Sequence, residues 1–172
     1  EKAKSPRERA VLALIEPIGN APHIVLIERP EYQGVHSKQI AFPGGAREPE
    51  DKSLEETALR EANEEVGVSP SDVIISKPIS PVYIPPSNFM VHPFVAFCNH
   101  RPRFTAQQSE VAKIIEYPIE HLLDLSYRKQ VTMQAGMQNI RIKTKAFVLS
   151  EHVSWGATGM MLNELRLLIS RK

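Results

Sequence analysis

The stretch from residue 44 to residue 68 decides how the chain is interpreted, and it reads GGAREPEDKSLEETALREANEEVGV. Ser53, followed three residues later by Glu56, predicts a helix N-terminus with a capping box. Gly67 is the residue expected just past the end of that helix. The sequence therefore predicts a helix over residues 53–66, preceded by a tight turn at Gly44 and Gly45.

Three carboxylates share one side of this predicted helix. Glu61, Glu64 and Glu65 follow the i, i+3, i+4 spacing that places side chains on one face. Like charges at this spacing repel one another by about 0.2–0.5 kcal/mol per pair. A bound cation would relieve the repulsion, and hard divalent ions such as Mg²⁺ prefer oxygen ligands. A solvated surface helix with Glu–Arg pairs is the alternative.

The composition is that of a globular protein. The 172 residues are 42% hydrophobic and 24% charged, with a formal net charge of +1. This favours one domain over residues 1–172, with neither nucleic acid nor a membrane as partner. Cys98 is the only cysteine, which excludes an intrachain disulfide, and the apolar run 10–15 is too short for a signal peptide. We therefore expect a soluble cytoplasmic protein.

Strand and helix patterns are mixed along the chain. Strands are predicted for residues 9–15, 23–28, 73–79, 90–98, 111–117, 129–134 and 139–149, and helices for residues 53–66, 118–125 and from 157 onward. Segment 81–88 has too many prolines for a central strand, so we expect a stiff loop. This order predicts an α/β fold with a mixed sheet and helices on both faces.

The segment Arg60-Glu61-x-x-Glu64-Glu65-x-Gly67-Val68 behind a glycine pair resembles the Nudix box. Two features depart from the usual pattern: one additional residue precedes the arginine, and Ala62 fills an aliphatic position. The resemblance implies a Nudix α/β/α sandwich that hydrolyses a nucleoside diphosphate linked to another group, using Mg²⁺ or Mn²⁺. It implies a nucleotide-containing small molecule as substrate. The oligomeric state stays open, and a homodimer is one alternative.

The flanking residues narrow the resemblance. Residues 36–45 (HSKQIAFPGG), 84–88 (IPPSN) and 155–158 (WGAT) are similar to segments of the coenzyme A pyrophosphatase branch. That likeness implies coenzyme A or an acyl derivative as substrate, with 3',5'-ADP and 4'-phosphopantetheine as products. An arginine usual in the branch is Gly34 here, and Lys38 stands in a usual glycine position. Alternatives are ADP-ribose, a dinucleotide, a modified nucleoside triphosphate, or a non-catalytic binding module.

Individual roles follow from the resemblance. Glu61, Glu64, Glu65 and the backbone carbonyl of Gly45 would bind the metal. Arg60 would orient the acids by pairing with Glu56 or Glu64, and either Glu61 or Glu110 would be the general base. Residues expected at the substrate are His36 and Lys38 near a phosphate, Phe42 in the segment before the box, and Tyr83. Tyr83 either stacks on an adenine or packs its loop, and Asp51 is either part of the box or a turn residue.

Overall fold

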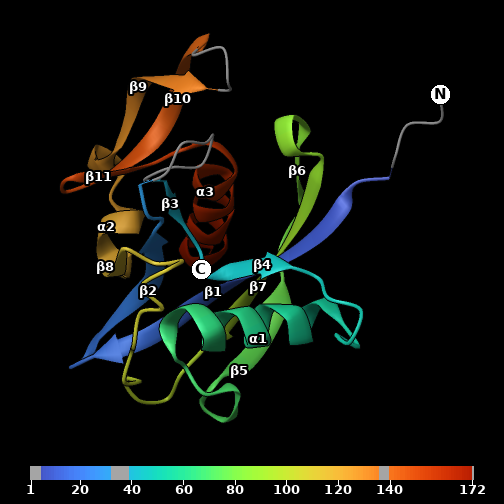
Figure 1. Cartoon of the computed structure of the whole chain (residues 1–172). Coiled ribbons are helices and arrows are strands. Elements are labelled where there is room, and N and C mark those ends of the chain that lie inside the picture. Colours follow the sequence, from blue (N-terminus) through green and yellow to red (C-terminus); the bar gives the residue numbers. More distant parts are fainter. Residues whose placement is uncertain (1–4, 32–38, 136–139, 172) are drawn as a thin grey trace.

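The computed structural model describes residues 5–31, 39–135 and 140–171. An eight-stranded sheet lies at the centre of the molecule (Figure 1), with strands in the order β3-β2-β1-β7-β5 and with β4, β6 and β8 paired to β1, β7 and β2. These strands span β1 Arg7–Ile18, β2 Ala21–Glu28, β3 Ile40–Ala41, β4 Gly44–Ala46, β5 Ile74–Pro78, β6 Val82–Ile84, β7 Phe89–Phe97 and β8 Lys113–Pro118. β1 and β7 are parallel, whereas β1 and β2 are antiparallel. The mixed sheet predicted from the sequence is confirmed.

Helices cover both faces of this sheet, as predicted. They are α1 Leu54–Val66, α2 Ile119–Leu123 and α3 Gly156–Ser170. Alternate residues of β1 point to opposite faces, so Leu12 and Leu14 pack with α1 while Val11 and Ala13 pack with α2 and α3. Both faces of β1 are therefore buried, which explains its continuous apolar run.

Three strands form a separate sheet, which the sequence pattern does not distinguish from the first. β9 Arg128–Ala135, β10 Ile140–Leu149 and β11 His152–Ser154 pair in the order β11-β10-β9. Phe147 and Leu149 of β10 are buried in the core beside α3. This small sheet (orange in Figure 1) carries the chain to the start of α3.

Two local predictions are wrong. Gly44 and Gly45 form no tight turn; they belong to β4, which runs antiparallel to β1. Segment 81–88 is not wholly a loop, because β6 pairs with the beginning of β7, and a 3-10 turn over Pro85–Ser87 follows it. The prolines flank β6 and do not interrupt it, which an edge strand tolerates.

Short helical turns complete the chain, at Pro70–Asp72 and Leu125–Tyr127. In the part of the chain that the structure describes, no helix is both long and apolar enough to cross a bilayer. Cys98 is buried with a free thiol, as its apolar surroundings in the sequence predict.

Candidate active site

Helix α1 holds two of its acids against the protein interior. Ala58, Ala62 and Val66 are fully buried at intervals of four residues and pack against the sheet. Small side chains let the helix lie close to β1, and Glu61 and Glu65 flank this stripe. Only 12% of the Glu61 side chain and 2% of the Glu65 side chain is exposed.

Strand β4 lies directly against these acids. The backbone N–H of Gly44 donates a hydrogen bond of 2.8 Å to Oε2 of Glu65. A side chain at Gly45 would overlap the carboxylate of Glu61, and one at Gly44 would overlap the backbone of β1. Gly44 is therefore required for the close approach of β4 to β1, and Gly45 leaves room for the Glu61 carboxylate; neither residue forms a turn.

Glu110 reaches the same place from a distant part of the sequence. The segment before it is fastened to the C-terminal turn of α1 by two backbone hydrogen bonds, Thr105 N to Val66 O (2.9 Å) and Gln107 N to Glu65 O (3.0 Å). Carboxylate oxygens of Glu61, Glu65 and Glu110 lie within 4.8 Å of one another. The structure thus gathers three acids into one group, which we call the acid cluster.

Within the acid cluster, the carboxylate of Glu65 has little compensating positive charge. Arg29 is near, with its Nη1 3.9 Å from Oε1 of Glu65. The pKa of Glu65 is raised to about 7, mainly by burial and also by the neighbouring Glu61 and Glu110, while the Gly44 N–H and Arg29 oppose the shift. Burial likewise raises the pKa of Glu61. Closely spaced, partly desolvated carboxylates with free oxygens fit a hard divalent cation.

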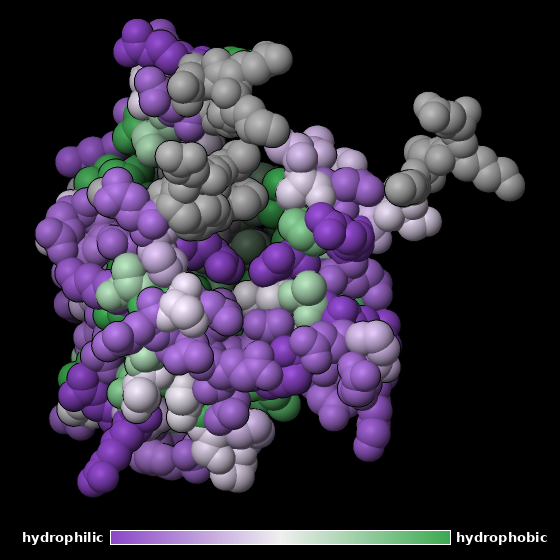
Figure 2. All heavy atoms as spheres, viewed as in Figure 1, coloured by the Kyte–Doolittle hydropathy of each residue, from purple (hydrophilic) through white to green (hydrophobic). Residues whose placement is uncertain are grey.

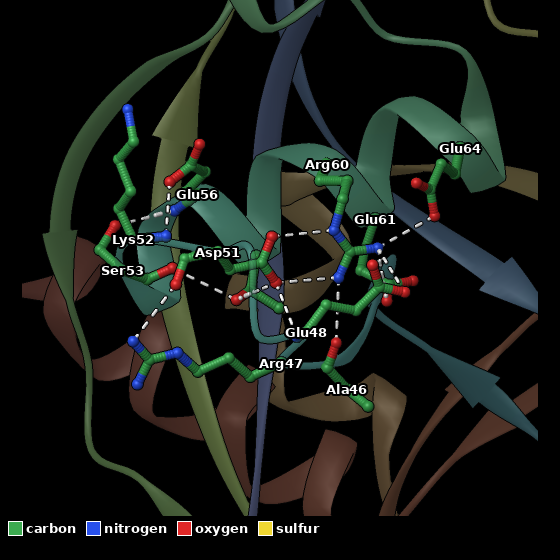
Figure 3. Close-up of polar contacts among 11 residues, drawn as sticks. Ala46, Arg47, Glu48, Asp51, Lys52, Ser53, Glu56, Arg60, Glu61 and Glu64 are labelled. Carbon is green, nitrogen blue, oxygen red and sulfur yellow. Dashed lines mark hydrogen bonds and ion pairs between the residues drawn. The ribbon is translucent and has the colours of Figure 1, made fainter.

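Arg60 forms a second network next to the acid cluster, beside the N-terminal half of α1 (Figure 3). Its guanidinium donates from Nε and Nη2 to the two carboxylate oxygens of Asp51, both at 3.0 Å. Asp51 also accepts from the Thr57 hydroxyl and the Glu48 N–H. Arg60 holds the pKa of Asp51 far below its usual range. Asp51 is therefore the anchor of Arg60, a role that its sequence position alone does not specify.

Arg60 also connects this network to the other acids of the helix. Its Nη1 donates to Glu61 at 3.2 Å and to Glu64 at 3.1 Å, so the predicted pairing with Glu64 is present. Glu56, the other predicted partner, instead accepts from the backbone N–H of Lys52. Glu64 is half exposed and bound to Arg60, and it lies outside the acid cluster.

A cavity of about 410 Å³ opens beside the acid cluster. Its lining combines two arginines with aromatic and aliphatic side chains and the start of α3: Arg9, Val11, Arg29, Gln39, Ala41, Phe42, Gly44, Ile84, Pro86, Phe89, Val91, Ile142, Trp155, Gly156, Ala157, Thr158 and Met161. Figure 2 shows a hollow on this face, with strongly hydrophilic residues around it. Gly44 lines the cavity and also binds Glu65, so the cavity and the acid cluster are adjacent.

The residues predicted to bind substrate are placed differently from one another. Phe42 lines the cavity and is 1% exposed. Tyr83 does not line it; the Tyr83 ring is half exposed and its hydroxyl donates to Asn88 at 3.0 Å. His36 and Lys38 lie outside the described residues. The cavity therefore gives Tyr83 no support as a substrate contact, while its neighbour Ile84 does line the cavity.

Sequence reasoning missed the two arginines of the cavity. Arg9 shares the β1 face of Val11, so alternation along the strand could have placed it here. Arg29 directly follows β2, next to the segment that leads to the glycines. Neither residue belongs to the motif around α1, which is why the motif did not indicate them.

A comparison with known families identifies the family of this chain. A model of the NUDIX domain matches residues 6–135. The chain belongs to the Nudix hydrolase family. It is 32% identical over 149 residues to the Nudix hydrolase NudL of Pectobacterium atrosepticum, covering 87% of this chain and 76% of the relative. NudL of Yersinia enterocolitica is 33% identical over 144 residues, covering 84% and 72%.

Solved Nudix structures share the fold at lower sequence identity. A Nudix hydrolase of M. smegmatis, RenU, superposes with a TM-score of 0.65 at 15% identity, covering 96% of this chain and 86% of its own. A MutT protein of Methanosarcina mazei gives a TM-score of 0.62 at 17% identity, covering 99% and 100%. As a Nudix hydrolase, this protein is an enzyme that hydrolyses acid anhydrides in nucleoside diphosphate derivatives with a divalent metal ion.

Proposed function

We propose that this Nudix hydrolase cleaves the diphosphate of coenzyme A or an acyl-coenzyme A, giving 3',5'-ADP and a 4'-phosphopantetheine, with Mg²⁺ or Mn²⁺ as the metal. One observation carries the proposal. Three sequence segments that resemble the coenzyme A pyrophosphatase branch, around Phe42, Ile84 and Trp155, meet at the cavity beside the acid cluster. They are far apart in the sequence, so their meeting at one cavity is not a consequence of chain proximity.

The character of the cavity supports a substrate of this kind. Phe42, Phe89 and Trp155 offer apolar and aromatic surface to a base or a thiol-bearing chain. Arg9 and Arg29 place positive charge between that surface and the acids. Arginine matches phosphate oxygens with a planar set of donors, so a diphosphate would lie between metal and guanidinium groups.

Each acid has a distinct part in the proposed reaction. Glu61 and Glu65 would hold the metal, with Glu64 able to join after leaving Arg60 and with the Gly45 backbone close by. The bound metal supplies Lewis-acid stabilisation of phosphate charge and a more acidic water. Arg60, fixed by Asp51, orients Glu61. The proton of the attacking water would pass to Glu61 or to Glu110, which is exposed and less constrained.

Other nucleotide substrates are the alternative within the family. Solved structures of similar fold include an Ap4A hydrolase of C. elegans and a Nudix domain of Shewanella oneidensis NrtR complexed with ADP ribose. Their TM-scores are 0.57 and 0.55 at 15% and 17% identity, so the likeness is of fold. ADP-ribose, a dinucleotide and a modified nucleoside triphosphate therefore belong in the same assay.

The test is a parallel assay of these substrates with Mg²⁺ or Mn²⁺, with products identified by mass spectrometry. We expect coenzyme A to give 3',5'-ADP and 4'-phosphopantetheine, and Glu65→Gln to lose the activity with every substrate. Faster turnover of ADP-ribose or a dinucleotide would refute the coenzyme A assignment and keep the enzyme class. A wild type that binds nucleotide but hydrolyses none of them would point to a binding module.

A further inference from the structure

Three arginines, Arg29, Arg9 and Arg7, lie near the acid cluster, the first two partly buried and the third exposed. Arg29 lies nearest, 3.9 Å from Glu65. Arg9 interacts with both Arg29 and Arg7; burial and these two arginines lower the pKa of Arg9, while Glu61 and Glu65 oppose the shift. Arg7 is exposed at the start of β1. Glu65 and Glu61 partly compensate Arg29 and Arg9, but among the described residues no carboxylate pairs with Arg7, so its place beside Arg9 calls for an explanation.

Phe89 orders the outer two arginines. The guanidinium carbon of Arg7 lies 4.3 Å from the centre of the Phe89 ring, and that of Arg9 lies 4.8 Å from it. The parallel pairing of β1 with β7 sets Arg7 opposite Phe89. Both guanidinium groups are thus held by one aromatic ring, and cation–π contact leaves their N–H donors available.

A second hollow begins where the cavity ends. An open groove is lined by Arg7, Glu8, Arg9, Ala46, Arg47, Glu48, Pro49 and Phe89. Arg9 and Phe89 line both the groove and the cavity. A ligand in the cavity can therefore extend past Arg9 into the groove, because the two hollows adjoin.

The other charges of the groove are already paired. Glu8 accepts from Arg47 at 3.3 Å and lies 3.8 Å from Nε2 of His92. Arg47 also donates to the backbone carbonyl of Asp51. Among the described residues, no carboxylate forms an ion pair with Arg7 or Arg9. The positive charge of the groove that no close ion pair neutralises is thus at these two side chains, and it is least compensated at Arg7, since Glu61 and Glu65 act on Arg9.

We infer that Arg7 and Arg9, held on Phe89, form a subsite for a phosphomonoester of the substrate that is separate from the diphosphate being cleaved. The inference rests on the proposed function, because it assumes that the diphosphate lies at the acid cluster. The recognised group is a phosphate carried on the nucleoside part of the substrate. Arg29, which lines only the cavity, then binds the diphosphate. Arg7, which lines only the groove, binds the second phosphate, and Arg9 lies between them because it lines both.

Binding of two nucleotides that differ by one phosphate tests this without catalysis. The probes are 5'-AMP and 3',5'-ADP, titrated calorimetrically into wild type and variants with Mg²⁺ present. A charge-assisted contact predicts that wild type binds 3',5'-ADP about 10- to 100-fold more tightly than AMP. Arg7→Gln should reduce this ratio to near one while AMP binding changes little. Phe89→Leu should also reduce the ratio, but it should weaken AMP binding as well, because Phe89 lines the cavity too.

Arg47→Gln is the matched control, because it removes the same charge from the same groove at a residue that is already paired. It should keep most of the preference for 3',5'-ADP. An equal loss in Arg47→Gln and Arg7→Gln would mean diffuse electrostatic attraction and would overturn the subsite. Equal binding of the two probes by wild type would overturn it as well.

The two proposals fail in different ways. If wild type hydrolyses coenzyme A but shows no Arg7-dependent preference for 3',5'-ADP, the subsite is wrong and the function stands. If the preference is present and depends on Arg7, but coenzyme A is not hydrolysed, the subsite stands and the substrate is another phosphorylated nucleotide. Circular dichroism of each variant shows whether the fold is retained.

Discussion

Two buried acids at helix α1 are in opposite states. Asp51, beside the N-terminal half of the helix, is buried but receives hydrogen bonds from Arg60, Thr57 and the Glu48 backbone. Glu65, in the last turn of the helix, is as deeply buried but has one backbone hydrogen bond and a distant arginine, with Glu61 and Glu110 crowding it. The pKa of Asp51 is lowered, whereas that of Glu65 is raised to about 7.

This difference indicates a structural role for Asp51 and a ligand-binding role for Glu65. A buried carboxylate that is fully hydrogen-bonded stabilises the fold and has no oxygen left for a ligand. A buried carboxylate beside other acids weakens the metal-free fold but keeps its oxygens for a cation. We therefore expect substitutions in the network around Asp51 mainly to lower stability, and substitutions in the acid cluster mainly to lower activity.

The largest effect is expected from Glu65→Gln. Losing a carboxylate that we propose binds the metal should lower kcat by about 10²- to 10⁴-fold, since a metal contributes several kcal/mol to catalysis. The free energy of unfolding without metal should not fall, because the variant removes a buried and poorly compensated charge. Steady-state kinetics and urea unfolding of the same preparation test both statements. A large loss of stability would place Glu65 with the structural acids.

Asp51→Asn should produce the converse pattern. Removing the negative charge leaves the Arg60 guanidinium without its main partner, and breaking a buried pair costs about 3 kcal/mol of unfolding free energy. Activity should fall less than in Glu65→Gln, through loss of the orientation that Arg60 gives Glu61. Glu64→Gln is the control on the same arginine: its half-exposed ion pair should contribute less than about 1 kcal/mol.

The sequence predicts some features of α1 and its surroundings but not others. The helix, its Ser53 cap and the Gly67 end are predictable, because they depend on neighbouring residues. The pairing of Arg60 with Glu64 is also local. The role of Asp51 is not, because nine residues separate it from Arg60 and the intervening loop decides where it lies.

The same limit applies to the remainder of the site. Glu110 could be suggested only by likeness to Nudix enzymes; its position depends on backbone bonds between segment 105–107 and the end of α1. The separation of β9, β10 and β11 into their own sheet depends on long-range pairing, which strand periodicity does not contain. Arg9 and Arg29 reach the cavity because β1 and β2 lie side by side.

Metal binding should depend on the acid cluster and not on the network around Asp51. Magnesium at about 100 times its Kd should stabilise wild type by about 2.7 kcal/mol, or about 5–10 °C in Tm for a chain of this size. Glu65→Gln should lose most of this shift, and Glu64→Gln should retain more of it. Thermal unfolding with Mg²⁺, Mn²⁺ and EDTA measures the effect. An undiminished shift in Glu65→Gln would place the cation elsewhere.

Glu110→Gln should have a smaller effect on activity than Glu65→Gln. Glu110 is exposed, so the variant should leave unfolding unchanged while lowering kcat by about 10²-fold, the lower end for a general base, if this residue accepts the proton. The pH profile of kcat separates this role from metal binding: loss of a general base removes the acidic limb, whereas loss of a ligand changes the metal dependence. An unchanged profile would leave Glu61 as the base.

Glu16 provides a third buried acid that sharpens the comparison. It is 1% exposed, and among the described residues neither of its oxygens accepts a hydrogen bond from a donor group. Burial raises its pKa, and the neighbouring Glu116 raises it further, while Arg101 pairs with Glu116. Glu16 lies five residues along β1 from Val11, the partner of Gly44, or about 17 Å at the rise of a strand.

If burial with a raised pKa were enough to make an acid functional, Glu16 would resemble Glu65. We expect instead that Glu16→Gln keeps full activity and changes only the pH dependence of stability. The folded state holds the Glu16 proton above the unfolded pKa, so wild-type stability falls as pH rises from about 4.5 through the raised folded value. At pH 8 the variant should exceed wild type by about 1–2 kcal/mol, and at pH 4 the two should agree. Urea unfolding at both pH values, alongside kinetics, measures this. Reduced activity in Glu16→Gln would contradict this expectation. It would mean that the crowding of carboxylates near the glycines is not what distinguishes Glu65 from Glu16.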